Sequence, residues 1–180
     1  MSKKVLIITT SLRANSNSTQ LANMFMEGAK QNGNQVEMIS LQNKHIEFCR
    51  GCLACQTLRK CVINDDMNAI IPKMHDADVI AFATPIYYYE MSGQMKTLLD
   101  RANALYGTDY HFRDIYMLTA AAEDSHEVPQ RAIEGLGGWI ECFENAHLAG
   151  TVFAGGVSDA GDIDGHNALS QAYDMGKSIV

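Results

Sequence analysis

The feature that most constrains the fold of this chain is a regular alternation of short apolar runs with stretches of helical spacing. The apolar runs are rich in β-branched residues and are bounded by turn residues, as β-strands are. They cover residues 4–10, 34–41, 78–84, 113–121 and 147–155. Between them, apolar residues recur every three or four positions, which is typical of helices. This alternation predicts an α/β fold with a five-stranded parallel sheet of order 2-1-3-4-5, right-handed crossovers and helices on both faces.

One domain accounts for the whole chain. Its 180 residues are about one domain's worth, and a hydrophobic content of 47% is enough for a substantial core. The sequence contains no repeat, linker or low-complexity segment, so we expect a single domain over residues 1–180. Residues 45–64 interrupt the alternation as an irregular cysteine-rich loop, placed between the second strand and a helix that begins near Asp65. Long loops of this kind are often functional.

Charge and the first residues of the chain argue against two classes of partner. The chain has 14 Lys and Arg against 21 Asp and Glu, a formal charge of -7, and it lacks a basic run that could follow a phosphate backbone. We therefore expect no nucleic-acid partner. After MSKK only four apolar residues follow without a break, too few for a signal peptide or a membrane span. We expect a cytoplasmic protein that does not enter a membrane.

The loop after the first strand predicts a phosphate site. Residues 9–22 read TTSLRANSNSTQLA, a strand end followed by a polar loop and the start of a helix. A helix N-terminus offers unpaired N–H groups and a partial positive charge. The loop adds neutral donors on Ser11, Ser16, Asn17, Ser18 and Thr19 and a cationic donor on Arg13. The alternative is an ordinary helix cap. The loop lacks the G-x-G-x-x-G pattern of a Rossmann dinucleotide site, which argues against NAD bound in that manner.

The loop after the third strand predicts a platform for a flat ring. Residues 84–101 read TPIYYYEMSGQMKTLLDR. Extended backbone along Pro85, Ile86, Tyr87 and Tyr88 would offer N–H donors to the edge of a ring, and a tyrosine would cover its face. The alternative is that the tyrosines lie under a loop or at a subunit contact. Ala120 and Ala121, after the fourth strand, would flank the other side of the ring.

In a sheet of order 2-1-3-4-5, the first and third loops border one ligand crevice. A phosphate site beside an aromatic platform suits a mononucleotide with a flat base. Flavin mononucleotide (FMN) fits best, because it occupies this crevice in sheets of this order.

These residues resemble the flavodoxin-like NADPH-dependent FMN reductases, and among them the branch that includes iron-sulfur flavoproteins. That family shows S-x-R-x-x-x-N-[ST] after the first strand, which matches Ser11, Arg13, Asn17 and Ser18. It also shows Pro-x-Tyr followed by G-x-x-K-x-x-x-D-R, matched by Pro85, Tyr87, Gly93, Lys96, Asp100 and Arg101. The resemblance extends over nearly the whole chain, including residues 61–67 and 160–164. It implies a flavodoxin-like fold, FMN held mainly by the first and third loops, reduction by NADPH or NADH, and a homodimer or tetramer.

Four cysteines lie within thirteen positions, in the segment FCRGCLACQTLRKC of residues 48–61. Cys49, Cys52, Cys55 and Cys61 have the spacing C-x2-C-x2-C-x5-C, which resembles the cluster motif of iron-sulfur flavoproteins and suits a [4Fe-4S] centre. Zinc more often uses two separated pairs of cysteines. Free or redox-active thiols are a further alternative, because similar loops occur in family members described simply as FMN reductases. We expect Cys142 to be a buried structural thiol in a helix.

The residues support two main functions. The first is an FMN-dependent oxidoreductase that passes electrons from NAD(P)H through FMN to a small-molecule acceptor such as a flavin or quinone. Its chemistry would reside in the flavin, so no side chain is expected to be catalytic. The second is an iron-sulfur flavoprotein that carries electrons between protein partners such as ferredoxin. A zinc-stabilised regulatory domain is a third hypothesis. We expect Asp65 and Asp66 to cap a helix, and Asp100 and Arg101 to form an ion-paired helix end or a dimer contact.

Overall fold

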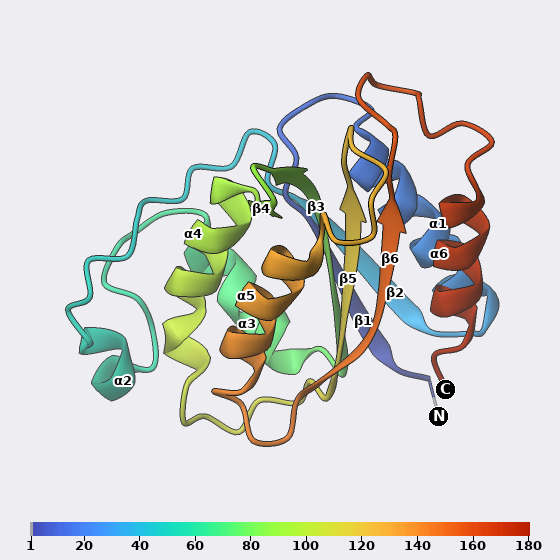
Figure 1. Ribbon diagram of the computed structural model, residues 1–180. Helices are drawn as coiled ribbons and strands as arrows, with labels where there is room; N and C mark the ends of the chain where they lie inside the picture. The colour runs from blue at the N-terminus through green and yellow to red at the C-terminus, as the bar shows by residue number, and fades with distance from the viewer. Residues whose placement is uncertain (1) are drawn as a thin grey trace.

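The computed structural model describes residues 2–180 and contains the expected parallel sheet (Figure 1). Its five parallel strands lie in the order β2-β1-β3-β5-β6, which is 2-1-3-4-5 among the parallel strands. Their bounds are β1 Lys4–Thr9, β2 Gln35–Ser40, β3 Val79–Tyr87, β5 Asp114–Ala120 and β6 His147–Ala154. The predicted order of these strands is therefore confirmed.

A sixth strand was not predicted. The short β4 (Glu90–Met91) folds back on the end of β3 and pairs with it antiparallel, with Ile86 opposite Met91. As a result β3 extends to Tyr87, three residues beyond the run expected from the sequence. Tyr88 and Tyr89 form the two-residue turn, and both have positive φ angles, 51° and 66°. A bulky residue rarely adopts that conformation, so the turn is strained.

Helices cover both faces of the sheet, as Figure 1 shows. On one face lie α1 (Asn17–Gln31) and α6 (Asn167–Lys177). On the other lie α3 (Met67–Asp76), α4 (Gly93–Arg101) and α5 (Gln130–Ile140). Alternate strand residues point to opposite faces, so Ile7 packs under α1 while Ile8 packs under the opposite layer. Two apolar cores result, one on each side of the sheet.

The helices α1 and α6 approach each other very closely. A Cβ atom added to Gly28 would lie 2.8 Å from the Lys177 backbone nitrogen, and one added to Gly176 would lie 2.9 Å from the Phe25 carbonyl carbon. Only glycine fits at these two positions, because contacts this short would force the backbones apart. The C-terminal helix is thereby held against the first helix, whose N-terminus borders the crevice described below.

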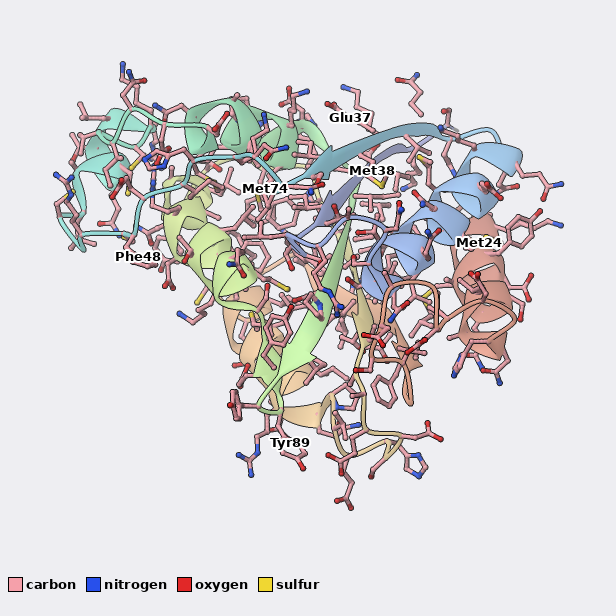
Figure 2. The ribbon with its side chains drawn as sticks, turned by 90° about the horizontal axis from the view of Figure 1, so that it is seen from above. Met24, Glu37, Met38, Phe48, Met74 and Tyr89 are labelled. Atoms are coloured by element: carbon pink, nitrogen blue, oxygen red, sulfur yellow. The ribbon has the colours of Figure 1, made fainter. Side chains whose placement is uncertain are left out.

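Residues 45–64 run along the outer side of α4, at the edge of the molecule (Figure 1). The segment is irregular, as expected, apart from the five-residue α2 (Ala54–Leu58). It lies beside the end of α4, which continues as a short 3-10 helix, η1 (Ala102–Leu105). Figure 2 shows the same segment from above, with Phe48 on the outer side of the molecule; its side chain is 78% exposed.

The expectation for Cys142 was wrong. The helix α5 ends at Ile140, and Cys142 lies exposed in the turn that follows. Ile140 and Phe143 take the buried positions, and the two residues between them, Glu141 and Cys142, are exposed. Among residues 2–180, no helix is long and apolar enough to cross a membrane.

Candidate functional site

A crevice opens at the carboxyl ends of β1, β3 and β5. The register aligns these ends, with Thr9 beside Ala83 and Thr84 beside Thr119, so the loops that follow the strands meet at one edge. The crevice has a volume of about 180 Å³. Its lining consists of Ser11, Arg13, Ser16, Asn17, Ser18, Pro85, Ile86, Tyr87, Ala120, Ala121, Ala122, Val157 and Ser158.

The first loop brings buried polar groups to the N-terminus of α1. Ser16 is the N-cap, and its hydroxyl oxygen accepts the N–H of Thr19 at 3.2 Å. The N–H groups of Asn17 and Ser18 precede the first backbone bond of the helix, from Gln20 N–H to the Ser16 carbonyl oxygen, and both residues line the crevice. Ser11, Ser16, Asn17 and Ser18 are all buried. Buried polar side chains at a helix N-terminus form a concave, donor-rich surface that suits an anion.

Two side chains of this loop are tied to the loop after β6. Arg13 Nη1 donates to the Ser158 carbonyl oxygen at 2.8 Å, and Asn17 Nδ2 donates to the Asp159 carbonyl oxygen at 2.9 Å. Asp162 holds that loop in turn by accepting the N–H groups of Asp159 and Ser158, which lower the pKa of its carboxyl group. The Oδ1 atom of Asn17 is buried and has no partner among the described residues. The crevice therefore contains a fixed acceptor that a bound hydroxyl or amide would satisfy.

Three buried hydroxyls join the strands below the crevice to α4. Ser92, the N-cap of α4, places its Oγ 2.9 Å from Thr10 Oγ1 and 3.2 Å from Thr84 Oγ1. The backbone N–H of Ser92 also donates to Thr84 Oγ1 at 3.1 Å. This network fixes the start of α4 against β1 and β3, and so sets the position of the hairpin between β3 and α4.

The three tyrosines of the hairpin occupy different environments. Tyr87 lines the crevice, whereas Tyr88 is 98% exposed at the turn. The hydroxyl of Tyr89 donates to Glu123 Oε2 at 2.8 Å, and the Arg131 guanidinium lies 5.8 Å from the centre of its ring. Figure 2 shows Tyr89 at the outer end of the hairpin. Tyr89 therefore ties the hairpin to the loop after β5, on the side of the crevice opposite α1.

All five cysteines line a second, larger hollow of about 690 Å³. Its walls come from the cysteine loop, the end of α4, η1 and the end of α5, where Trp139 lies, together with Cys142 and Phe143 in the turn after α5. The five thiols are free. Among residues 2–180, no three His, Cys, Asp or Glu side chains are arranged as they would be around a metal ion. The donor set is right for a thiolate-bound metal centre, but the sulfurs are distributed around the wall of the hollow.

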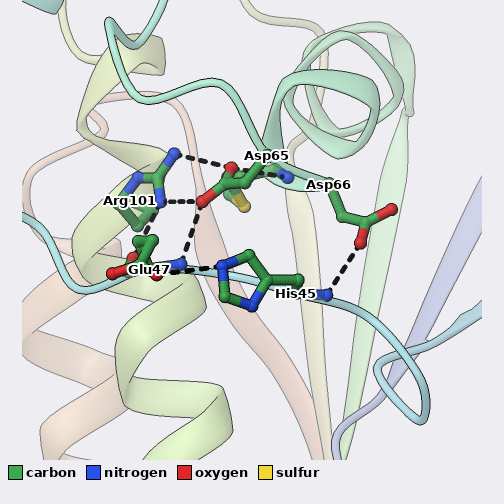
Figure 3. Close-up of polar contacts among 6 residues, drawn as sticks. His45, Glu47, Asp65, Asp66 and Arg101 are labelled. Atoms are coloured by element: carbon green, nitrogen blue, oxygen red, sulfur yellow. Dashed lines mark hydrogen bonds and ion pairs between the residues drawn. The ribbon is translucent and has the colours of Figure 1, made fainter.

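A buried ion pair closes the cysteine loop at its base (Figure 3). Arg101 Nη1 lies 2.6 Å from Asp65 Oδ2 and Nη2 lies 2.9 Å from Asp65 Oδ1, with both side chains at 1% exposure or less. Arg101 Nη1 also donates to the Glu47 carbonyl oxygen at 2.7 Å. Burial alone would raise the pKa of Asp65, but hydrogen bonds from Arg101, Glu47 and Met67 lower it. The two ends of the loop are thus joined through the last residue of α4.

Asp65 and Asp66 thus do more than the expected helix capping. Asp65 accepts the Met67 N–H, as a cap does, but its main partner is Arg101. Asp66 Oδ2 accepts the N–H of His45 at 2.7 Å. Asp100 was expected to form an ion pair at the helix end. It pairs with Lys96 on the surface of α4, with 2.7 Å between Lys96 Nζ and Asp100 Oδ1. The partner of Arg101 lies 36 residues away in sequence, which is why the sequence pattern did not reveal it.

The sequence profile of the NADPH-dependent FMN reductases matches residues 3–171. The chain belongs to this family. Curated relatives include an iron-sulfur flavoprotein of Methanocaldococcus jannaschii, 37% identical over 102 residues, which are 57% of this chain and 53% of that protein. An iron-sulfur flavoprotein of Methanosarcina thermophila is 28% identical over 96% of this chain and 87% of its own length. The chain spans about half the length of several of the curated relatives that it matches.

Solved structures of other proteins share the fold of this member of the NADPH-dependent FMN reductase family. An NAD(P)H:quinone oxidoreductase from Methanothermobacter marburgensis superposes with a TM-score of 0.74 at 17% identity, over 99% of both chains. The azoreductase AzrA gives a TM-score of 0.74 at 15% identity, over 98% of this chain and 100% of its own. The predicted flavodoxin-like fold and the predicted family are therefore confirmed.

In this family member, the structure brings together most of the residues that the sequence nominated. The crevice lining includes ten of them: Ser11, Arg13, Ser16, Asn17, Ser18, Pro85, Ile86, Tyr87, Ala120 and Ala121. Thr19 and Tyr88 lie outside it: the hydroxyl of Thr19 is 2.8 Å from that of Ser16, and Tyr88 points into solvent. Sequence reasoning did not single out Ala122, Val157 or Ser158 as lining residues. Ala122 directly follows two nominated alanines, whereas no local pattern marks Val157 or Ser158.

Proposed function

We propose that the protein binds FMN in the crevice and transfers electrons from NAD(P)H to a small acceptor such as a flavin or quinone. The observation that carries this proposal is the buried polar surface at the start of α1, placed beside the extended end of β3. One side of the crevice suits a phosphate and the other suits the edge of a flat ring. The membership of the chain in the NADPH-dependent FMN reductases supports the same activity.

The first loop fits the phosphate and the chain that links it to the ring. The free N–H groups of Asn17 and Ser18, with the hydroxyls of Ser11 and Ser18, would donate to a phosphate dianion. The unpartnered Oδ1 of Asn17 needs a donor, and the hydroxyls of a ribityl chain are donors. Arg13 is already engaged with Ser158, so we assign it to closing the loop over the phosphate as well as to neutralising its charge.

The third and fourth loops fit the ring. The backbone N–H groups of Ile86 and Tyr87, after Pro85, would reach its polar edge, while the small side chains of Ala120, Ala121 and Ala122 leave one side open. Bound FMN supplies the group that accepts a hydride and passes on electrons. The residues of the chain hold the ring, orient it and place N–H donors where negative charge develops. The lining consists of apolar, hydroxyl, amide and guanidinium side chains, and we assign the chemistry to the flavin rather than to a side chain.

An absorbance spectrum of anaerobically purified protein, recorded before and after adding NADPH or NADH, tests this function. We expect flavin bands that bleach with either donor and return when a quinone is added. Protein that retains FMN but is reduced by neither nucleotide would contradict the reductase. An Asn17→Ala variant keeps the backbone N–H but loses the side-chain Oδ1, so it should lose FMN affinity by up to about tenfold, since a neutral hydrogen bond contributes about 0.5–1.5 kcal/mol.

A second candidate is an iron-sulfur flavoprotein that carries electrons between ferredoxin-like partners. One specific observation favours it: the four cysteines of the motif all line one hollow. Relatives named iron-sulfur flavoproteins support it as well. Soft thiolate ligands would suit a [4Fe-4S] centre, which would supply one-electron transfer. Iron and sulfide near four atoms each per chain after anaerobic reconstitution would support a cluster; iron-free protein would exclude it.

We place this activity in the cytoplasm, where reducing conditions keep thiols free of disulfides. We also propose that the protein acts as a homodimer or tetramer.

A further inference from the structure

The hollow beside the cysteine loop has the size and the lining of a small-molecule site. Its volume of about 690 Å³ lies within the range of about 300–1,000 Å³ that is usual for ligand pockets. Its apolar lining includes Leu53, Val62, Ile63, Tyr106, Trp139 and Phe143. Leu53, Val62 and Tyr106 are 57%, 53% and 50% exposed. Apolar side chains that are left open to water around one hollow indicate a surface that a ligand covers.

One wall of the hollow is a fixed aromatic surface. The ring of Trp139, near the end of α5, has its centre 4.6 Å from that of Phe143 and 5.9 Å from that of Phe112. The planes of Trp139 and Phe112 are 19° apart, so these two rings are stacked. Phe112 is fully buried in the core, and the indole is therefore held in one orientation. A rigid aromatic wall favours a flat aromatic ligand, whose rings can stack on it or meet it edge-on.

Polar groups of α4 and η1 favour an acceptor oxygen on that ligand. Arg101 lines the hollow, and its two terminal nitrogens are occupied by Asp65 and the Glu47 carbonyl oxygen. Its Nε–H is buried and has no partner among the described residues. Asn103 lines the hollow too, and one N–H of its amide donates to the sulfur of Cys55 at 3.2 Å. A buried donor without an acceptor is unfavourable, and a ligand oxygen at this side of the hollow would relieve that cost.

The charges in the lining favour an anion. Arg50 is an exposed lining residue that forms no ion pair within residues 2–180. Arg101 is paired with Asp65, and the lining carboxylate of Asp100 is paired with Lys96 at 2.7 Å. The guanidinium of Arg50 is therefore the uncompensated charge of the lining. Its forked N–H groups match the two oxygens of a carboxylate.

We propose that the hollow is a second small-molecule site, which binds a flat aromatic anion such as an aromatic carboxylate. Its rings would lie against Trp139 and its anionic oxygens toward Arg50 and Asn103. The site is distinct from the FMN crevice, because the two lie at opposite ends of α4, a helix of nine residues and about 13 Å in length. The proposal rests on neither FMN nor a cluster. It makes the thiols part of the wall of a ligand pocket instead of the ligands of a metal.

The single tryptophan of the chain, Trp139, reports directly on this site. Anilinonaphthalene sulfonate (ANS) is a flat aromatic anion that becomes fluorescent on apolar surfaces. We expect one ANS molecule to bind each chain of the full-length, FMN-loaded protein. It should quench the emission of Trp139 and fluoresce by energy transfer from it, without releasing FMN. N-phenylnaphthylamine, which has the same rings without the sulfonate, serves as the neutral comparison.

Arg50→Gln should lower ANS affinity about two- to fivefold, the effect of losing one exposed ion pair, and leave N-phenylnaphthylamine affinity unchanged. Lys60→Gln is the matched control. It makes the same charge change in the same loop, but Lys60 lies outside the lining of the hollow, so both affinities should equal those of the wild type. Tyr106→Ala removes an exposed aromatic side chain from the wall and should weaken both probes.

ANS that binds without quenching Trp139, or that displaces FMN, would overturn the placement of the site. Equal affinities for ANS in Arg50→Gln and Lys60→Gln would overturn the recognition of an anion. Wild type that holds iron in the hollow and binds no ANS would contradict the proposal as well. Protein that binds ANS as expected but is not reduced by NADPH or NADH would contradict the proposed reductase and leave this site standing.

Discussion

Arg101 is a cation with a fully buried side chain, an arrangement that costs several kcal/mol unless the charge is paired. Asp65 supplies the opposite charge through two short contacts, and two backbone N–H groups satisfy the remaining carboxylate positions. This buried ion pair therefore closes the cysteine loop at its base. Surface pairs such as Lys96–Asp100 contribute far less, because water screens them.

Replacing Arg101 by Met should lower the free energy of unfolding by about 3–5 kcal/mol, because Asp65 would remain as an uncompensated buried charge. Urea denaturation followed by circular dichroism measures the change. Lys96→Met, in the same helix, is the matched control and should change stability by less than about 1 kcal/mol. Equal effects of the two substitutions would show that the Asp65–Arg101 pair is not buried in solution.

His75 should make the stability of the protein depend on pH near neutrality. Its Nδ1 lies 2.8 Å from Asp76 Oδ1 and its Nε2 lies 3.1 Å from Asp109 Oδ1. The carboxylate of Asp76, and then that of Asp109, raise the pKa of His75 against the opposing effect of burial. Because the folded-state pKa is the higher one, this stabilisation is complete below about pH 6.5 and is lost as pH rises through the raised value.

The melting temperature measured from pH 6 to pH 9 in the wild type and in His75→Gln checks this prediction. The wild type should lose its advantage over the variant as pH rises. His126→Gln, at an exposed position, should follow the wild type. A constant difference between wild type and His75→Gln across this range would contradict it.

Two features stand out among the helices and strands: the close approach of α1 to α6, and the tight turn of the β3–β4 hairpin. The glycines of α1 and α6 let two backbones meet, which holds the C-terminal helix beside the helix that begins at the crevice. The β3–β4 hairpin contains a strained turn, in which Tyr88 and Tyr89 both have positive φ angles. Strain of this kind persists where the surroundings impose it, and here the surroundings are the crevice loops.

Gly176→Ala should destabilise the protein by about 1–3 kcal/mol, because its methyl group would collide with the backbone of α1 at Phe25. Gly137→Ala, in the middle of α5, is the matched control. A methyl group there meets nothing within 4 Å, so the higher helix propensity of alanine should stabilise the protein by about 0.5–1 kcal/mol. Thermal denaturation of both variants measures the two opposite effects; a neutral Gly176→Ala would contradict the close crossing.

Tyr88→Asn should raise stability by about 1 kcal/mol, because asparagine tolerates the positive φ of the turn and the exposed tyrosine makes few contacts to lose. Chemical denaturation measures the gain. Tyr87→Asn, at the crevice, should instead lower FMN affinity. If Tyr88→Asn weakens FMN binding as much as Tyr87→Asn does, the exposed tyrosine takes part in holding the flavin after all.

At the scale of the whole molecule, the parallel sheet gathers four loops at one edge, while α4 connects that edge to the cysteine hollow. The N-cap of α4, Ser92, is bonded to Thr10 and Thr84 beneath the crevice. Its last residue, Arg101, holds the cysteine loop. One helix therefore fixes both candidate sites in a single framework, with the crevice at its start and the hollow at its end.

We expect the protein to form a homodimer or a tetramer and each chain to unfold as one domain. The exposed Leu12 and Phe48 line a further pocket together, and Tyr88 is exposed at the turn of the β3–β4 hairpin; exposed apolar surface of this kind favours association. Light scattering after size exclusion should give two or four times the chain mass of 19.8 kDa. Calorimetry should show a single cooperative transition. A monomer, or two separate transitions, would contradict these expectations.

The order of the parallel strands, the helix layers on both faces and most of the crevice lining could be predicted from the sequence alone. These features follow from local periodicity and from the rule that parallel strands place their carboxyl ends together. Contacts between residues far apart in the chain could not be predicted in this way: Asp65 pairs with Arg101, Arg13 donates to the Ser158 carbonyl oxygen, and Cys142 lines the same hollow as the thiols of the loop. Such pairs depend on how helices settle on the sheet, and hydrophobic patterns record which face of a helix is buried but not its partner across the fold.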